Sequence, residues 1–195
     1  MTLILEPMTK PLVHIHADES CLGNQNSDTD RPGGAGGVVE MWRGRNWERR
    51  DYWISAPTTT NNKMAIQSAI VGLGLLKKPC HVIFISDSQY LVRGASEWMF
   101  GWARAGWKRK TGTLENADMW QHLYEAVRAH DVEWKWIKGH AGHPQNEYAN
   151  HLATRAAKEQ TSSNGMVESA FVQWLDQQRE KYDRYLQFDH TAEPA

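Results

Sequence analysis

Three acidic side chains, Asp18, Glu19 and Asp87, stand where short apolar segments of the sequence end. Asp18 and Glu19 follow a run that begins at Leu12, and Asp87 follows residues 83–86. Because α/β sheets place ligands at the carboxyl ends of their strands, two such neighbouring strands would bring these carboxylates together. Neighbouring carboxylates repel each other unless a cation lies between them, and oxygen ligands suit Mg²⁺ or Mn²⁺. The sequence therefore predicts a divalent metal site here; the alternative is that each acid only caps the turn after its strand.

The segments that must position these acids alternate between strand and helix patterns. Strands are expected over residues 12–17, 33–42, 47–55, 81–86 and 132–137, and helices after residues 57–60, over 117–129 and over 145–159. The glycines at 94, 101, 106 and 112 predict a broken helical pattern between 88 and 130. The spacing of strand, helix and strand between 12 and 86 predicts a right-handed parallel crossover. The sheet should therefore be mixed.

Composition limits the classes of protein to which the chain can belong. The 195 residues carry a formal net charge of −1, which excludes a uniformly basic nucleic-acid coating protein but allows a local basic patch. We find no apolar run long enough to span a membrane and no secretory signal at the N-terminus. Two cysteines are too few for a disulfide framework. We therefore expect a cytoplasmic protein without membrane contact.

Beyond the acids, the sequence contains a series of short motifs in a fixed order. They are Ser20-Cys21-Leu22-Gly23-Asn24, Pro32-Gly33-Gly34-Ala35-Gly36, Thr60-Asn61-Asn62-Lys63-Met64, Asp87-Ser88-Gln89-Tyr90, and Trp136-Ile137-Lys138-Gly139-His140-Ala141-Gly142-His143-Pro144 with Asn146-Glu147. With these motifs the chain resembles type 1 ribonuclease H over roughly residues 11–158. The resemblance implies an α/β, ribonuclease H-like fold with a five-stranded mixed sheet flanked by helices. It also implies hydrolysis of the RNA strand of an RNA/DNA hybrid with two divalent metal ions, Mg²⁺ or Mn²⁺.

The chain departs from the family's four active-site carboxylates at two positions. Ala65 stands where the family has a Glu on its first helix, and Asn150 stands where the family has an Asp on its last. Glu19 stands where the family usually has Gly, and the Asp18-Glu19 pair is similar to the pair of metal ligands in type 2 ribonuclease H. Our hypothesis is that Glu19 replaces the missing Glu, although successive side chains of a strand point to opposite faces. A twist or bulge at the strand end could re-aim it; the alternative is a solvated charge.

Under this hypothesis the ligand set is Asp18, Glu19, Asp87 and Asn150. The amide oxygen of Asn150 would hold a cation less tightly than a carboxylate, so we expect a greater demand for metal or a preference for Mn²⁺. His140, in a glycine-flanked loop, matches the family residue that assists proton transfer and product release. The second reading is a catalytically weak or inactive hybrid-binding module, because two of the four family carboxylates are missing.

The resemblance also implies which residues contact the hybrid. Polar contacts with the hybrid are expected from Cys21, Asn24, Thr60, Asn61, Asn62 and Gln89. Residues 93–110 are similar to the family's basic protrusion, which contacts the DNA strand, and carry five basic residues and one acidic residue, a local charge of +4. The protrusion candidates are Trp98, Trp102, Arg104, Trp107 and Lys108, although at least two of the tryptophans are expected to pack inside it. We expect modest affinity that falls with salt.

The expected organisation is an N-terminal tail over residues 1–10, a ribonuclease H domain over 11–160, and a linker with a helical extension over 161–195. The apolar residues Phe171, Trp174, Leu175, Tyr182, Tyr185 and Leu186 fit the stripe of an extra C-terminal helix. We expect this helix to pack on the domain, with self-association as the alternative. No obligatory protein partner is evident from the sequence, and we expect a monomer.

Overall fold

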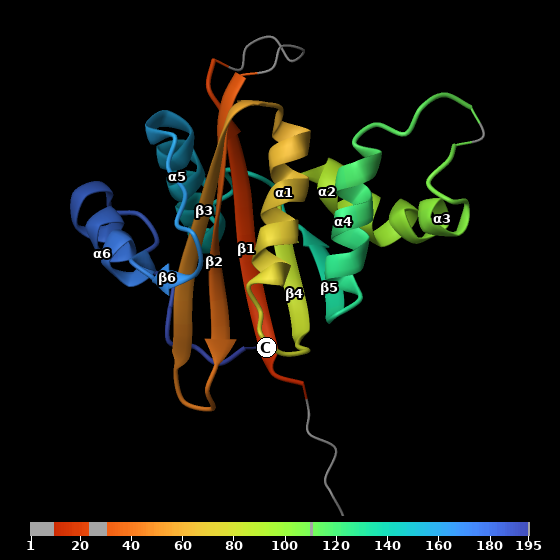
Figure 1. Cartoon of the computed structure of the whole chain (residues 1–195). Helices are drawn as coiled ribbons and strands as arrows, with labels where there is room; N and C mark the ends of the chain where they lie inside the picture. Colours follow the sequence, from red (N-terminus) through yellow and green to blue (C-terminus); the bar gives the residue numbers. More distant parts are fainter. Residues whose placement is uncertain (1–9, 24–30, 110, 195) are drawn as a thin grey trace, which may run out of the picture.

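A six-stranded mixed sheet forms the centre of the molecule (Figure 1). The computed structural model describes residues 10–23, 31–109 and 111–194. The strands are β1 (Leu12–Cys21), β2 (Arg31–Trp42), β3 (Trp47–Thr59), β4 (His81–Ser86), β5 (Asp131–Trp136) and β6 (Val167–Glu168), in the spatial order β5-β4-β1-β2-β3-β6. The predicted mixed sheet is confirmed, and β6, from the C-terminal extension, adds a strand to the five that were expected.

The sheet changes from antiparallel to parallel at β1. β1 pairs antiparallel with β2, and β2 with β3, whereas β4 and β5 run parallel to β1. The turn between β2 and β3 is closed by a 2.9 Å hydrogen bond from the backbone N–H of Arg43 to the carbonyl of Asn46. The helix between β1–β3 and β4 makes the parallel crossover, as the spacing of the sequence predicted.

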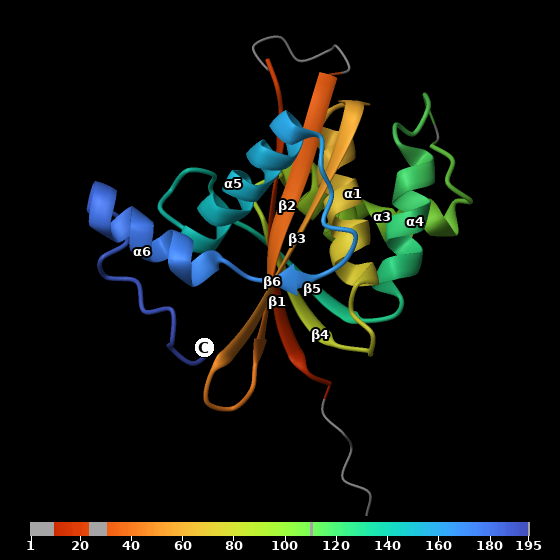
Figure 2. The same cartoon turned by 60° about the vertical axis from the view of Figure 1, so that its left-hand side comes forward.

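Helices cover both faces of the sheet (Figures 1 and 2). One face carries α1 (Asn61–Gly74), α2 (Gln89–Arg93), a π-helical turn η1 (Gly94–Trp98), α3 (Met99–Arg104) and α4 (Ala117–Val127). The other face carries α5 (Pro144–Glu159) and α6 (Phe171–Tyr182). α1 begins where expected, because the Thr60 hydroxyl accepts a hydrogen bond from the backbone N–H of Lys63 and caps the helix.

Two apolar cores lie on the two faces. The larger core packs the sheet against α1 and α4 and contains fully buried Ile15, Phe84, Ile66 and Trp120. The smaller core joins Val38 of β2 to Tyr148 and Leu152 of α5 and to Phe171 and Leu175 of α6. The C-terminal extension therefore packs on the domain, as expected.

A buried carboxylate also holds the extension in place. Asp51 of β3 accepts hydrogen bonds from the hydroxyl of Tyr148 (2.5 Å), from the hydroxyl of Ser169 (2.6 Å) and from the backbone N–H of Ala170 (3.1 Å). Because Ser169 and Ala170 immediately precede α6, this carboxylate determines where the last helix starts.

The structure corrects three details of the sequence-based expectations. β1 continues four residues beyond the expected end at Ala17. The helical run passes through Gly94 and Gly101 without a break; a Cβ at Gly94 would overlap the ring of Trp120, so the glycine permits close packing. α6 ends at Tyr182, so Tyr185 and Leu186 follow the helix, and the Tyr182 and Leu186 side chains are 63% exposed.

Within residues 10–23, 31–109 and 111–194, no helix is both long enough and apolar enough to span a membrane.

Candidate active site

Three carboxylates converge where β4 ends beside β1. The parallel pairing of these strands stops at Ala17 and Ser86, whereas β1 stays paired with β2 through Cys21. Asp18 and Asp87 therefore follow the last paired residues of adjacent parallel strands. Asp18, Glu19 and Asp87 each offer one oxygen, and these three oxygens lie within 4.8 Å of one another. The structure thus brings together the acids that the sequence singled out.

Glu19 reaches this cluster from the side of the sheet that faces α1. Alternation along β1 places Glu19 on the same face as Ala17, which packs in the same core as Ala65 of α1. Asp18 points to the opposite face, toward α5. Neighbouring residues of a strand point to opposite faces, but β4 ends at Ser86 and leaves the edge of β1 free at this point. The side chains of Asp18 and Glu19 can therefore both approach Asp87 around that edge.

Burial and the neighbouring negative charges disfavour the ionised forms of Asp18 and Glu19. Asp18 is 4% exposed, and its desolvation together with the negative charge of Asp87 raises its pKa to about 7. Desolvation of Glu19, together with the charges of Asp18 and Asp87, raises the pKa of Glu19 well above its usual value. A cation between the three groups would remove this repulsion.

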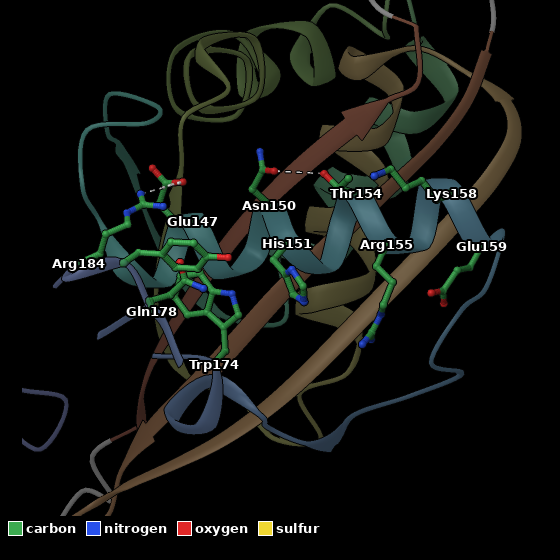
Figure 3. Close-up of a pocket in the computed structure, with 11 residues that line it drawn as sticks. Glu147, Asn150, His151, Thr154, Arg155, Lys158, Glu159, Trp174, Gln178 and Arg184 are labelled. Carbon is green, nitrogen blue, oxygen red and sulfur yellow. Dashed lines mark hydrogen bonds and ion pairs between the residues drawn. The ribbon is translucent and has the colours of Figure 1, made fainter. Parts of the chain in front are cut away.

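Helix α5 supplies amide side chains to the same cluster. Asn150 interacts with the Asp18 carboxylate, and its amide oxygen accepts a 3.2 Å hydrogen bond from the Thr154 hydroxyl (Figure 3). The amide nitrogen of Asn146 lies 3.5 Å from Asp18 Oδ2, and its buried amide oxygen has no hydrogen-bond partner among the described residues. Asn146 was not predicted as a site residue, although its spacing of four from Asn150 places both on one face of the helix.

Glycines in β2 allow α5 to come this close. A Cβ on Gly36 would lie 2.9 Å from the backbone nitrogen of Ala153 and 3.0 Å from the carbonyl oxygen of Ala149. Gly34 faces the same helix, and its Cβ would overlap the backbone of α5. The glycine-rich motif therefore brings the amides of α5 within reach of Asp18.

The loop between β5 and α5 approaches the cluster from the other side. Gly139 packs directly on Asp87, because a Cβ there would overlap Asp87 Oδ2 and lie 3.2 Å from its Cγ. His140 follows with a positive φ of 52° and a side chain that is 76% exposed. Its Nδ1 lies 3.7 Å from Glu147 Oε2, and the same oxygen lies 3.9 Å from the guanidinium of Arg184 (Figure 3). The contact with Arg184 was missed because it joins residues distant in the sequence.

The predicted hybrid-contacting residues occupy different environments. Asn62 and Gln89 are exposed at the beginnings of α1 and α2, whereas Thr60, Asn61 and Cys21 are partly buried. The amide oxygen of Asn61 is buried without a hydrogen-bond partner among the residues described. Asn24 lies outside the described residues.

The tryptophans of the protrusion mostly pack against the body of the protein. Trp102 contacts Trp120 with ring centroids 5.4 Å apart, and Trp107 contacts Tyr124 at 5.7 Å. Trp98 is half-buried beside Trp102, and Arg104 and Lys108 are exposed. These contacts agree with the expectation that at least two of the tryptophans have a packing role.

Comparison with known proteins relates this arrangement to one family. The RNase H family model matches residues 10–158. The chain is 43% identical over 148 residues to a ribonuclease H from Shewanella sp. (strain ANA-3), covering 75% of this chain and 88% of the relative. It is 44% identical over 146 residues to a ribonuclease H from Idiomarina loihiensis, covering 74% of this chain and 87% of that relative.

A solved structure shares both the fold and much of the sequence. LC9-RNase H1, described as a type 1 RNase H with the type 2 active-site motif, superposes with a TM-score of 0.79 and 48% identity. The superposition covers 87% of this chain and 82% of LC9-RNase H1. The family match, the identity to these relatives and the shared fold show that the chain belongs to the ribonuclease H family.

Proposed function

We propose that this protein is an endoribonuclease that hydrolyses the RNA strand of RNA/DNA hybrids, with Asp18, Glu19, Asp87 and Asn150 as its metal ligands. The observation that carries the ligand set is the approach of three carboxylate oxygens to within 4.8 Å, with Glu19 on the face that Ala65 leaves without an acid. LC9-RNase H1, with its type 2 motif in a type 1 fold, supports a relocated Glu.

The residues present fit divalent cations with oxygen ligands. Asp18 and Glu19, whose charges are unfavourable without a counter-ion, together with Asp87 and an amide next to Asp18, make a hard-ligand set suited to Mg²⁺ or Mn²⁺. When bound, two such ions supply activation of water and stabilisation of the leaving oxygen. Asp18 and Asp87 would hold them from two strands, and Glu19 from the α1 face of β1.

Asn150 makes this site less negative than one with four carboxylates. Its amide oxygen bonds to Thr154, so serving as a ligand requires the amide to turn toward the cluster. We therefore expect half-maximal activity at a higher metal concentration than in a variant with Asp at this position, and a stronger dependence on Mn²⁺.

The position of His140 supports a role in proton transfer near the cluster. Its exposed imidazole is on the residue next to Gly139, which packs on Asp87, and Glu147 lies near its Nδ1. We propose that His140 transfers a proton to or from the reacting groups and assists product release, while Glu147 orients its ring.

The hybrid would bind by its shape and backbone. Asn62 and Gln89 are exposed at the starts of α1 and α2, and Arg104 and Lys108 add positive charge on the protrusion. The remaining proposed contacts are Cys21, Asn24, Thr60, Asn61, Trp98, Trp102 and Trp107. The domain limits, a monomeric state and a cytoplasmic location stay predictions.

The competing function is a hybrid-binding module without catalysis. The replacement of two family carboxylates by Ala65 and Asn150 favours it, and the same substrate contacts would serve it. Cleavage of a labelled RNA/DNA hybrid, assayed separately with Mg²⁺ and Mn²⁺, distinguishes the two. Absence of cleavage with either ion, with hybrid binding retained, would favour the binding module.

The role of Glu19 is tested by replacing its carboxylate with an amide. We expect Glu19→Gln to lower kcat by at least about 100-fold, because a metal ligand is lost at the reacting centre. The matched control is Glu133→Gln on the exposed face of β5, which should cleave like the parent. If Glu19→Gln cleaves as fast as the parent while Ala65→Glu strongly raises activity, the ligand set is wrong and the site is a weakened version of the family site.

The role of Asn150 is tested by restoring a carboxylate. Asn150→Asp should lower the metal concentration required for half-maximal cleavage. An unchanged metal titration would show that residue 150 is not a ligand.

A further inference from the structure

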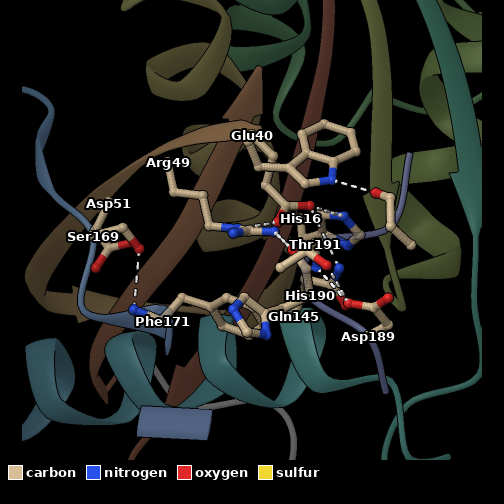
Figure 4. Close-up of polar contacts among 12 residues, drawn as sticks. His16, Glu40, Arg49, Asp51, Gln145, Ser169, Phe171, Asp189, His190 and Thr191 are labelled. Atoms are coloured by element: carbon tan, nitrogen blue, oxygen red, sulfur yellow. Dashed lines mark hydrogen bonds and ion pairs between the residues drawn. The ribbon is translucent and has the colours of Figure 1, made fainter. Parts of the chain in front are cut away.

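A second group of side chains that could hold a metal ion lies outside the carboxylate cluster, on the face of β1 and β2 that carries α5 and the C-terminal residues. Figure 4 shows two of its members, His16 and Glu40. His14 and His16 are two residues apart on β1 and therefore point to the same face. Glu40 of β2 is paired directly opposite His14. The sheet register thus brings two imidazoles and a carboxylate to one place.

The donor atoms of this group are close enough to share an ion. One ligand atom from each of His14, His16 and Glu40 lies within 4.8 Å of the other two, and His16 Nε2 is 3.3 Å from Glu40 Oε2. Some point therefore lies within about 2.8 Å of all three atoms. Ligand distances to Zn²⁺ are about 2.0–2.2 Å for nitrogen and oxygen, so small side-chain rotations would complete the approach.

One imidazole nitrogen of this group lacks a hydrogen bond in the structure. His14 Nε2 is buried and has no hydrogen-bond partner among the described residues, whereas the buried His16 Nε2 faces Glu40 Oε2. Burying a polar nitrogen without a partner is unfavourable by about 1–3 kcal/mol. A metal ion bound to His14 Nε2 would compensate this cost.

The surroundings favour the metal-binding forms of His14 and Glu40. Burial lowers the pKa of His14, which favours the neutral ring. Burial alone would raise the pKa of Glu40, but His16 and Arg49 outweigh it and lower this pKa to about 2, so the carboxylate is ionised. Arg49 Nε donates to Glu40 Oε1 (2.5 Å), which leaves Oε2 facing His16, and Gln145 lies 3.4 Å from Oε2.

The C-terminal residues close over this group. The Arg49 guanidinium donates a 2.7 Å hydrogen bond to the carbonyl of His190, and Trp47 Nε1 donates one of the same length to the carbonyl of Ala192 (Figure 4). Arg49 therefore connects Glu40 to the end of the extension. Contacts of this kind, beyond the ligands themselves, orient the ligands of protein metal sites.

We propose that His14, His16 and Glu40 form a binding site for Zn²⁺, separate from the carboxylates at Asp18, Glu19 and Asp87. Two imidazole nitrogens and one carboxylate oxygen are a ligand set typical of zinc, and a solvent molecule would take the fourth position. The ion would stabilise the junction between β1, β2 and the C-terminal residues. This site does not depend on the proposed catalytic function.

The test uses the full-length, untagged chain after removal of bound metal by a chelator. An Asp18→Asn/Asp87→Asn background abolishes the carboxylate cluster as a competing site. In this background we expect one Zn²⁺ per chain in a competition titration with a chromophoric chelator, the visible absorption of tetrahedral Co²⁺, and a Zn²⁺-dependent rise in melting temperature.

Replacing one ligand shows whether the histidines hold the ion. His14→Gln and His16→Gln in the same background should each weaken Zn²⁺ binding by at least about tenfold and abolish the Co²⁺ absorption. His122→Gln, on the exposed surface of α4, is the matched control and should bind like the background. Circular dichroism checks folding, and if His16→Gln does not fold, His14→Gln decides.

The proposal is overturned by either of two results. One is that the background chain binds no Zn²⁺ at micromolar concentrations. The other is that the folded His14→Gln variant binds Zn²⁺ with the affinity of the background.

Discussion

Gly139 gives a way to move one carboxylate of the cluster without disturbing the fold. A Cβ at this position would overlap Asp87 Oδ2 and approach its Cγ to 3.2 Å, and no other atom comes nearer to it than Asp87. Gly139 does not have a positive φ, so Ala is compatible with the backbone. Gly139→Ala should therefore displace the end of the Asp87 side chain and leave the backbone in place.

The size of the effect follows from this overlap. Restoring an ordinary contact moves the carboxylate oxygen by on the order of 1 Å, and a misplacement of that size in a catalytic site costs about 100-fold in rate. Because the displaced group is the end of a flexible side chain, the free energy of unfolding should change by less than about 1 kcal/mol. We expect the loss mainly in kcat.

The assay compares hybrid cleavage, metal dependence and thermal unfolding in the parent and the variant. The control is Gly74→Ala at the end of α1, where a Cβ meets no atom within 4 Å and φ is not positive. Gly74→Ala should cleave like the parent. Cleavage by Gly139→Ala within threefold of the parent, with the fold intact, would refute the assignment of Asp87 as a positioned metal ligand.

Three further predictions concern a buried ion pair and the C-terminal extension. Because the pKa of Glu40 is lowered to about 2, its ionisation stabilises the folded state above pH 4.5 by up to about 3 kcal/mol, and this contribution is lost as the pH falls from 4.5 toward 2. In metal-free urea titrations, the difference in free energy of unfolding between the parent and Glu40→Gln should therefore shrink over that pH range. A difference that stays constant would contradict the lowered pKa of Glu40. Arg184→Ala removes an exposed contact with the Glu147 carboxylate beside His140 and should lower kcat by at most about fivefold with little change in KM; a larger effect on KM would place Arg184 in hybrid binding instead. Asp51→Asn weakens the hydrogen bonds that hold the start of α6 and should lower the free energy of unfolding by about 2 kcal/mol in urea, and an unchanged midpoint would show that the apolar contacts suffice to hold the helix.

Much of the fold could be predicted because its signals are local. The apolar runs that became β1 and β4, the cap at Thr60 and the turn at residues 43–46 all depend on neighbouring residues. The exact end of β1 was not predicted, because that end is set by pairing with β2 and not by the residues of β1 alone. β6 was missed because two residues carry no strand pattern, and they pair only where the extension meets β3.

The sequence by itself identified the family, the acids Asp18 and Asp87, and the question that Ala65 and Asn150 raise about catalysis. Whether Glu19 could join those acids was beyond it, because alternation along a strand places neighbouring side chains on opposite faces. The tertiary structure decided that point, since β4 ends at Ser86 and leaves an edge of β1 around which both side chains reach Asp87. The cluster of His14, His16 and Glu40 likewise exists only through the pairing of β1 with β2, which brings residues 26 positions apart to face each other.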